Sequence, residues 1–181
     1  MTILEKIIET KKNELEIVKK TISIRELKNL ANFSRKSVSL VERLKNSSHG
    51  IIAEHKRKSP SKSIINDSIL INQIIKGYDQ ADVCGISVLT DKEYFGGSLD
   101  DLINARKLTN IPILRKEFII DEYQIIEAKA NGADVILLIA ACLEENQIMN
   151  FSSLAKEIGL EVLIEIHNEN ELKKCLIDTI D

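Results

Sequence analysis

Charged side chains follow short apolar segments at several points along this chain of 181 residues. Glu54 and Lys56 follow the first such segment, Lys116 lies at the end of another, and Glu165 lies at the end of a third. Lysines and carboxylates that share a partly desolvated place have shifted pKa values and suit proton transfer to a bound molecule. The residue types therefore indicate acid–base chemistry, and the alternative is that each charge faces water or pairs with a neighbour.

The elements that must position these charges are alternating strands and helices. The expected strands are residues 50–54, 83–90, 111–118, 134–141 and 160–166. The expected helices after them are residues 69–78, 99–108, 121–132, 148–158 and 169–176. This alternation predicts an α/β fold with a parallel sheet, in which the carboxyl ends of the strands share one rim. An open doubly wound sheet and part of a (β/α)₈ barrel both fit, although no GxGxxG motif follows the first strand.

Strand periodicity predicts which of these side chains share a face. Glu54 and Lys56 point the same way, with His55 opposite. Lys116 shares its face with Phe118, and Arg115 and Glu117 lie on the other face.

Local signals predict several helix ends. Ser23 and Ser98 are expected N-caps, and Asn66, Asp67 or Ser68 is available to cap the helix at 69–78. Asp121 with Gln124 resembles a capping box, and Gly132 suits the position after that helix. We expect residues 1–49 to form a helical extension and residues 50–181 to form the sheet with its helices.

Composition limits the partners. The formal net charge is −3, which does not favour nucleic acid or a membrane. No apolar run is long enough to span a bilayer, and no secretory signal is visible. The three cysteines are far apart, which fits a reducing cytosol, and no His/Cys cluster has metal-ligand spacing. We therefore expect a cytoplasmic protein without a metal.

Several motifs resemble those of the indole-3-glycerol phosphate synthase family, in the family's order. They are IIAEHKRKSPSKS at 51–63, ISVLTDKEYFGGSLDDL at 86–102, ILRKEFIIDEYQIIEAKANGADVILLIAA at 113–141 and GLEVLIEIHNENEL at 159–172. The resemblance implies a (β/α)₈ barrel of tryptophan biosynthesis that needs no cofactor or metal. It converts 1-(2-carboxyphenylamino)-1-deoxyribulose 5-phosphate to indole-3-glycerol phosphate, with release of carbon dioxide and water.

The resemblance also implies roles for individual residues. Lys116 is the expected general acid in ring closure, and Glu165 an acid/base group during loss of water. Lys56 is expected to hold the substrate carboxylate, with Glu54 orienting it. Substrate-binding residues are expected at Ser59, Pro60, Phe95, Phe118, Leu137 and Ile139.

Length is the main departure from the family pattern. A (β/α)₈ barrel typically needs about 250 residues, and this sequence reaches the fifth strand and part of its helix. We therefore expect a C-terminally truncated barrel with open edges at strands one and five, which favour self-association. An inactive fragment of the enzyme remains an alternative, as does another phosphate-binding barrel such as phosphoribosylanthranilate isomerase.

Overall fold

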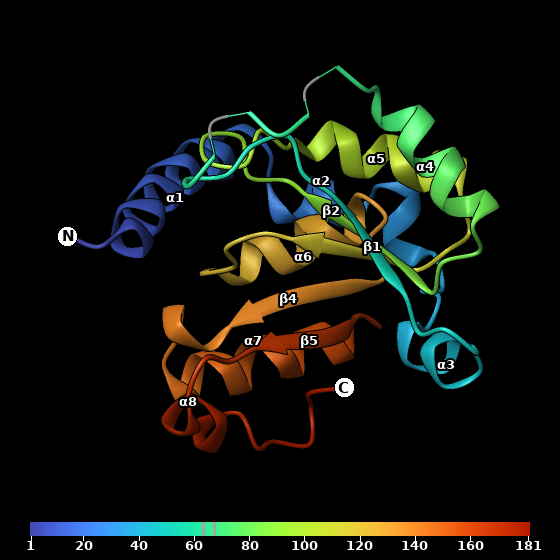
Figure 1. Cartoon of the computed structure of the whole chain (residues 1–181). Helices are drawn as coiled ribbons and strands as arrows, with labels where there is room; N and C mark the ends of the chain where they lie inside the picture. The colour runs from blue at the N-terminus through green and yellow to red at the C-terminus, as the bar shows by residue number, and fades with distance from the viewer. Residues whose placement is uncertain (63, 67) are drawn as a thin grey trace.

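The computed structural model describes residues 1–62, 64–66 and 68–181. Its centre is one sheet of five parallel strands in the order of the sequence. The curved sheet and its helices can be followed in Figure 1. The strands are β1 (Ile52–His55), β2 (Gly85–Leu89), β3 (Ile113–Lys116), β4 (Val135–Ile139) and β5 (Glu161–Glu165). The predicted alternation and parallel sheet are confirmed.

Four helices cover the outer face of this sheet. They are α4 (Ile71–Gln80), α5 (Leu99–Leu108), α6 (Glu122–Ala130) and α7 (Glu145–Glu157), and the shorter α8 (Glu169–Lys174) follows β5. The main core lies between these helices and the outward side chains of the strands, such as Ile86, Ile113 and Ile136, which are fully buried. Both faces of β2 and β4 are buried, which explains why the sequences of these two strands are nearly continuous runs of apolar residues.

The inner face of the sheet carries a separate apolar cluster that extends along the strands, and α3 (Leu40–Lys45) covers its amino-terminal end. Leu40 of this helix packs there with Leu114 and Val135. The carboxylate of Glu161 fixes α3 in place, because it accepts hydrogen bonds from the Leu40 and Val41 amides and from the Ser39 hydroxyl. An acidic group at a helix N-terminus is favoured by the unpaired amides and by the helix dipole.

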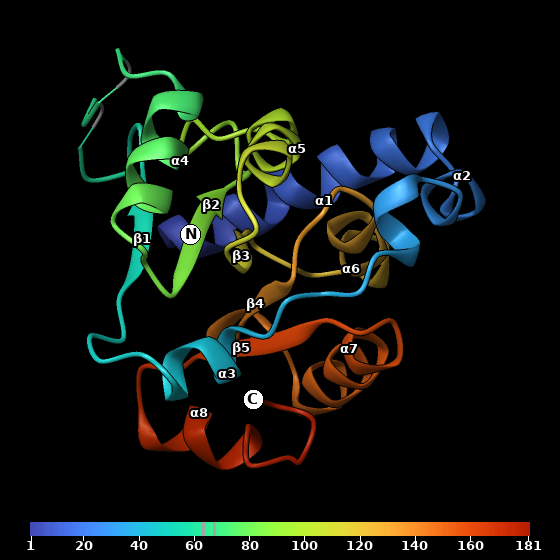
Figure 2. The same cartoon turned by 90° about the vertical axis from the view of Figure 1, so that its right-hand side faces the viewer.

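The first helices pack beside α6, as Figure 2 shows. They are α1 (Ile3–Thr21), α2 (Ile24–Lys28) and the 3₁₀ turn η1 (Ala31–Ser34). Leu15 and Leu27 meet Tyr123 and Ile126 in a small buried cluster. Ser23 caps α2 as predicted, in a capping box with Glu26.

Asp134 joins the segment after η1 to the sheet. It is fully buried and receives four hydrogen bonds, from Arg35 (2.7 Å), Arg106 (2.7 Å) and the amides of Val38 (2.8 Å) and Ile113 (2.9 Å). Such a carboxylate is stable in the interior only because every lone pair direction meets a donor.

Several local predictions need correction. Helix α4 begins at Ile71 with Leu70 as its N-cap, and no side chain caps it. Asn66 instead accepts from the Ile69 amide in the preceding turn at 3.4 Å. Of the other proposed caps, Ser68 donates to Asn66, and Asp67 lies outside the described residues.

The predicted capping box at α6 does not form, although Ser98 caps α5 as expected. Asp121 does cap α6, by accepting from the Tyr123 amide at 2.9 Å. The side chain of Gln124 turns instead to the Ile120 amide and the Phe118 carbonyl, because those buried backbone groups need partners. Gly132 follows the C-cap with φ +97°, as predicted for the residue after the helix.

The strands are also shorter than predicted. Strand β4 ends at Ile139, and Ala140–Cys142 form the 3₁₀ turn η2. Alanine-rich apolar sequence does not distinguish a buried strand from a buried turn. None of the helices in the described part of the chain is both long and apolar enough to cross a bilayer.

Candidate active site

Glu54 links two lysines on the inner face of the sheet. Its Oε1 lies 3.1 Å from Nζ of Lys56, and its Oε2 lies 3.3 Å from Nζ of Lys116. The Ser87 hydroxyl donates to Oε2 as well, at 3.0 Å. The side chains of Lys56 and Lys116 are about one third exposed and that of Glu54 is 27% exposed, so all three are partly desolvated yet accessible to a ligand.

Strand register explains why these residues meet. Glu54 pairs with Ser87 across β1 and β2, and Leu89 pairs with Lys116 across β2 and β3. Since alternate residues share a face, Glu54, Ser87 and Lys116 all project inward near the carboxyl ends of three adjacent strands. Lys56 follows β1 directly on the same face, as the sequence predicted.

The neighbours of Glu54 decide its protonation state. Burial alone would raise the pKa of its carboxyl group, but Lys116, Lys56 and Ser87 outweigh that effect and hold the pKa below its ordinary value. Glu54 is therefore a stable counter-ion for the two lysines at neutral pH.

An aromatic pair borders the lysines. The ring centroids of Phe95 and Phe118 lie 5.9 Å apart, with the planes inclined by 37°. Nζ of Lys56 lies 6.0 Å from the centroid of Phe95, at the outer limit of a cation–π contact. Both rings are only half-buried, and they offer an apolar surface beside two cations.

The inner face continues into buried aliphatic side chains. Leu137 and Ile139 belong to one apolar cluster against which Phe118 packs. Both are almost fully buried, so they form the floor beneath the phenylalanine rather than an exposed wall. The structure thus brings together Glu54, Lys56, Lys116 and four apolar residues from the predicted set.

The loop that carries Phe95 is tightly built. The Asp91 carboxylate accepts from the Tyr94 amide at 2.7 Å and the Phe95 amide at 3.1 Å. A Cβ at Gly97 would collide with the Leu89 carbonyl, so only glycine lets the loop return this close to β2. Arg57 adds a tie from the preceding loop, through a bidentate pair with Asp101 at 2.6 and 2.9 Å.

Ser59 and Pro60 lie in the loop after β1. Backbone bonds between Ser59 and Lys62, at 2.8 and 3.0 Å, close a tight turn with Pro60 exposed on it. The Ser59 hydroxyl stays within that turn and contacts Ser61 at 3.2 Å. Both residues therefore lie in this loop, and in the described part of the chain no hydrogen bond joins them to the group formed by Glu54, Lys56 and Lys116.

Glu165 is separate from that group as well. It ends β5 and shares the inner face with Ile139, its partner in the register. Its Oε1 lies 3.4 Å from Nε2 of His167, and among the described residues no ion pair joins Glu165 to Lys56 or Lys116. It lies at the opposite edge of the sheet from Glu54, across the concave inner face.

Sequence reasoning missed Ser87. It is the single polar side chain in β2, which is otherwise buried and apolar except for Gly85. That isolation was the available signal, because a buried hydroxyl needs a partner and the register supplies Glu54.

Known proteins are similar to this chain over nearly its whole length. The profile of the indole-3-glycerol phosphate synthase family matches residues 4–180. The chain belongs to the indole-3-glycerol phosphate synthase family. An indole-3-glycerol phosphate synthase from Bacteroides thetaiotaomicron is 46% identical over 170 residues, which is 94% of this chain and 65% of the relative. Those from Neisseria meningitidis serogroup B and Caldanaerobacter subterraneus are 41% and 44% identical, and the match spans 96% of this chain and 68% and 67% of theirs.

The chain therefore spans about two thirds of the length of these indole-3-glycerol phosphate synthases. The match begins within α1 and includes all five strands, so the N-terminal helices belong to the family pattern as much as the sheet does. The fold is a partial (β/α)₈ barrel of this carboxy-lyase family. The alternative of a phosphoribosylanthranilate isomerase finds no support in these matches.

Proposed function

We propose that this chain carries the acid–base group of an indole-3-glycerol phosphate synthase. The reaction is ring closure, decarboxylation and dehydration of 1-(2-carboxyphenylamino)-1-deoxyribulose 5-phosphate. The observation that supports it best is the Lys56–Glu54–Lys116 bridge beside the Phe95 and Phe118 rings. Two cations next to an aromatic surface match a substrate that has a carboxylate on an aromatic ring.

Lys116 is the proposed general acid. As the ring carbon attacks the substrate ketone, negative charge develops on the ketone oxygen, and an ammonium group there can donate a proton. Lys116 suits this role because its side chain is about one third exposed and Glu54 holds its ammonium group on the inner face. Family membership adds to this proposal, since the residue lies in the ILRKEF segment that resembles the family motif.

Lys56 is the proposed partner of the substrate carboxylate. Its ammonium group lies beside the face of Phe95, where an anthranilate ring stacked on the phenyl group would present its carboxylate. Glu54 fixes both lysines and balances their charge before substrate enters. When the carboxylate leaves as carbon dioxide, Glu54 remains as the counter-ion.

The remaining residues have smaller roles in this proposal. Glu165, across the inner face, acts as the acid/base group during loss of water. Phe95, Phe118, Leu137 and Ile139 hold the aromatic ring, and Ser59 with Pro60 shapes the loop that covers the phosphate end.

Turnover in a completed barrel tests this function. We would extend the chain after Asp181 with the residues that follow the matched region in the Bacteroides thetaiotaomicron relative. The expected result is formation of indole-3-glycerol phosphate, followed by fluorescence, with far less from the 181 residues alone. A folded extended protein without turnover would contradict the proposal, and circular dichroism would establish the folding.

We further propose that the 181 residues self-associate through the edges of the sheet. In the described part of the chain, strands β1 and β5 each have one neighbour, and apolar side chains are exposed on or beside them at Ile51, Ile52, Leu163 and Ile166. Unpaired edges of apolar strands favour pairing with another chain. We expect light scattering to show dimers or larger species, and Ile52→Lys to reduce them. A strictly monomeric chain at high concentration would contradict this proposal.

A further inference from the structure

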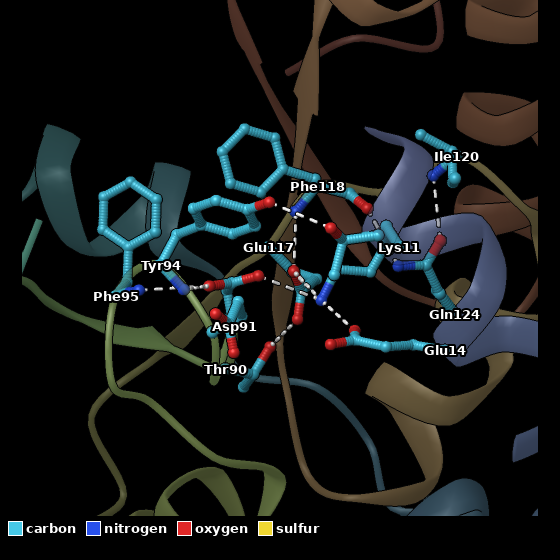
Figure 3. A network of polar contacts seen from close by, with 12 residues as sticks. Lys11, Glu14, Thr90, Asp91, Tyr94, Phe95, Glu117, Phe118, Ile120 and Gln124 are labelled. Atoms are coloured by element: carbon cyan, nitrogen blue, oxygen red, sulfur yellow. Dashed lines mark hydrogen bonds and ion pairs between the residues drawn. The ribbon is translucent and has the colours of Figure 1, made fainter. Parts of the chain in front are cut away.

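Lys11 of α1 is a buried lysine that the proposed chemistry does not use. It is 5% exposed although its helix is rich in solvated charges. Its Nζ lies 2.6 Å from Glu14, 3.1 Å from Asp91 and 3.3 Å from Glu117. Figure 3 shows this ammonium group at the meeting point of the three carboxylates. Two of them come from the barrel, so Lys11 fixes the N-terminal helix to the ends of β2 and β3.

The two barrel carboxylates each hold a segment that carries a ring of the candidate site. The other oxygen of Asp91 accepts from the Phe95 amide at 3.1 Å. Oε1 of Glu117 accepts from the Phe118 amide at 2.9 Å. Glu117 also follows Lys116 directly in the chain. The same figure shows both phenyl rings on one side of this network, with Lys11 on the other.

We propose that Lys11 is a positioning residue, which sets the spacing of the Phe95 and Phe118 rings through Asp91 and Glu117. The structural part of this proposal is independent of the enzyme's activity. The consequence for substrate binding rests on the proposed function, in which these rings hold the anthranilate group. The N-terminal helix then contributes to the site without touching the substrate.

Electrostatics explain why the arrangement depends on this one cation. Among the described residues, Lys11 is the only cation within 4.0 Å of Asp91, and Asp91 Oδ2 has no hydrogen-bond donor. Glu117 keeps other partners, because the Thr90 hydroxyl donates at 2.7 Å and Arg115 lies at 4.0 Å. Without Lys11, a buried carboxylate would lose its compensation, which is unfavourable in the interior. The Asp91 loop would therefore move.

The surroundings of Lys11 keep it charged. Burial alone would lower the pKa of its ammonium group, but Glu117, Glu14 and Asp91 outweigh burial and raise the pKa above its ordinary value. Lys11 is therefore a charged ammonium group in this contact. Tyr94 adds a second tie to α1, since its hydroxyl lies 2.9 Å from that of Thr10.

Fluorine NMR of the 181-residue chain tests the structural part directly. The chain has four phenylalanines, so labelling with 4-fluorophenylalanine gives four resonances. Phe95 and Phe118 report on the site, whereas Phe33 and Phe151 lie elsewhere. In Lys11→Met we expect the Phe95 and Phe118 resonances to move by more than a linewidth, with the other two unchanged. Single Phe→Tyr variants assign the four signals.

The matched control is Lys19→Met. Lys19 lies on the same helix and pairs with Asp121 at 2.5 Å, so it also ties α1 to the barrel, but its partner holds neither ring. This variant should leave the Phe95 and Phe118 resonances in place. Unmoved site resonances in Lys11→Met, or equal movement of all four, would overturn the proposal.

Asp91→Asn keeps the test decisive if Lys11→Met does not fold. The amide oxygen can still accept from the Tyr94 and Phe95 amides, and the charge that faces Lys11 is lost. We expect a larger movement for Phe95 than for Phe118, because Glu117 is untouched. Equal movement of the two, or none, would contradict the route through Asp91.

Kinetics in the extended barrel test the consequence for binding. Lys11→Met should lower kcat/KM by about 10- to 10²-fold, chiefly through a higher KM, because the misplaced rings bind the ground state less well. Lys19→Met should match the parent. A fall in kcat with unchanged KM would contradict the role assigned here. Absence of turnover in the parent would refute the proposed function alone, since the NMR result does not depend on it.

Discussion

Replacing Lys116 with methionine in the extended barrel should lower kcat by about 10²- to 10⁴-fold, the range expected for a lost general acid. Methionine keeps most of the side-chain volume and removes the charge, so the fold should remain. Product formation followed by fluorescence measures the loss. The control is Lys107→Met, at an exposed position on α5, which should retain full activity.

The same substitution changes the state of Glu54. Burial raises the pKa of Glu54, and the positive charge of Lys116 is the largest single contribution that opposes burial. Its removal should therefore raise that pKa, which a carbon NMR titration of the carboxyl group would detect. A carboxyl group whose pKa is lower in the folded than in the unfolded protein stabilises the fold at pH values above its unfolded-state pKa. This stabilisation is lost as the pH falls through the folded-state pKa. The variant should accordingly have a lower free energy of unfolding at neutral pH, and that free energy should fall less steeply when the pH is lowered. Activity equal to the parent, or an unchanged pKa of Glu54, would contradict the bridge as the active group.

Replacing Asp134 with alanine should lower the free energy of unfolding by about 3–5 kcal/mol, as for one partner removed from a buried ion pair. Arg106 is itself 7% exposed in its side chain, so it would lose its buried carboxylate partner. The amides of Val38 and Ile113 would lose their acceptor as well. Since domains of this size have about 5–15 kcal/mol of stability, the loss would be a large part of the total.

Urea unfolding followed by circular dichroism measures this effect. Glu9→Ala is the control, because this carboxylate is exposed on α1 and its removal should change stability by less than about 0.5 kcal/mol. A loss below 1 kcal/mol for Asp134→Ala would mean that the cluster around Asp134 is solvated in solution. Unchanged unfolding cooperativity in both variants would keep the two values comparable.

The predictable part of this molecule is the part governed by local periodicity. Strand alternation placed Glu54 with Lys56 and Lys116 with Phe118, because a side chain's face depends only on its position along the strand. The common rim of parallel strands then brought Glu54 and Lys116 together. The helix start at Ser98 was equally local, since the cap lies beside the helix it begins.

Other features depend on partners that are distant in sequence. Lys11 has the pattern of any charged residue on a surface helix, and only Asp91 and Glu117 make it a buried one. The predicted grouping of Glu165 with the lysines rested on the common rim of the strands and on the family resemblance. The structure places Glu165 on the far strand, where its carboxylate lies beside the imidazole ring of His167. Its proposed role depends on the width of the inner face, which no short motif encodes.

The strand order has a consequence for how the chain is made. Because β2 to β5 each pair with the strand before them, each of these four strands leaves the ribosome with one partner already synthesised. The segment after η1 is the exception. Arg35 and Val38 donate hydrogen bonds to Asp134, and Leu40 donates one to Glu161 in the fifth strand, so their partners are synthesised much later than they are. An early stretch of the nascent protein therefore lacks these partners until Asp134 and then Glu161 have been synthesised, and the docking of Leu40 requires a sheet that has grown to five strands.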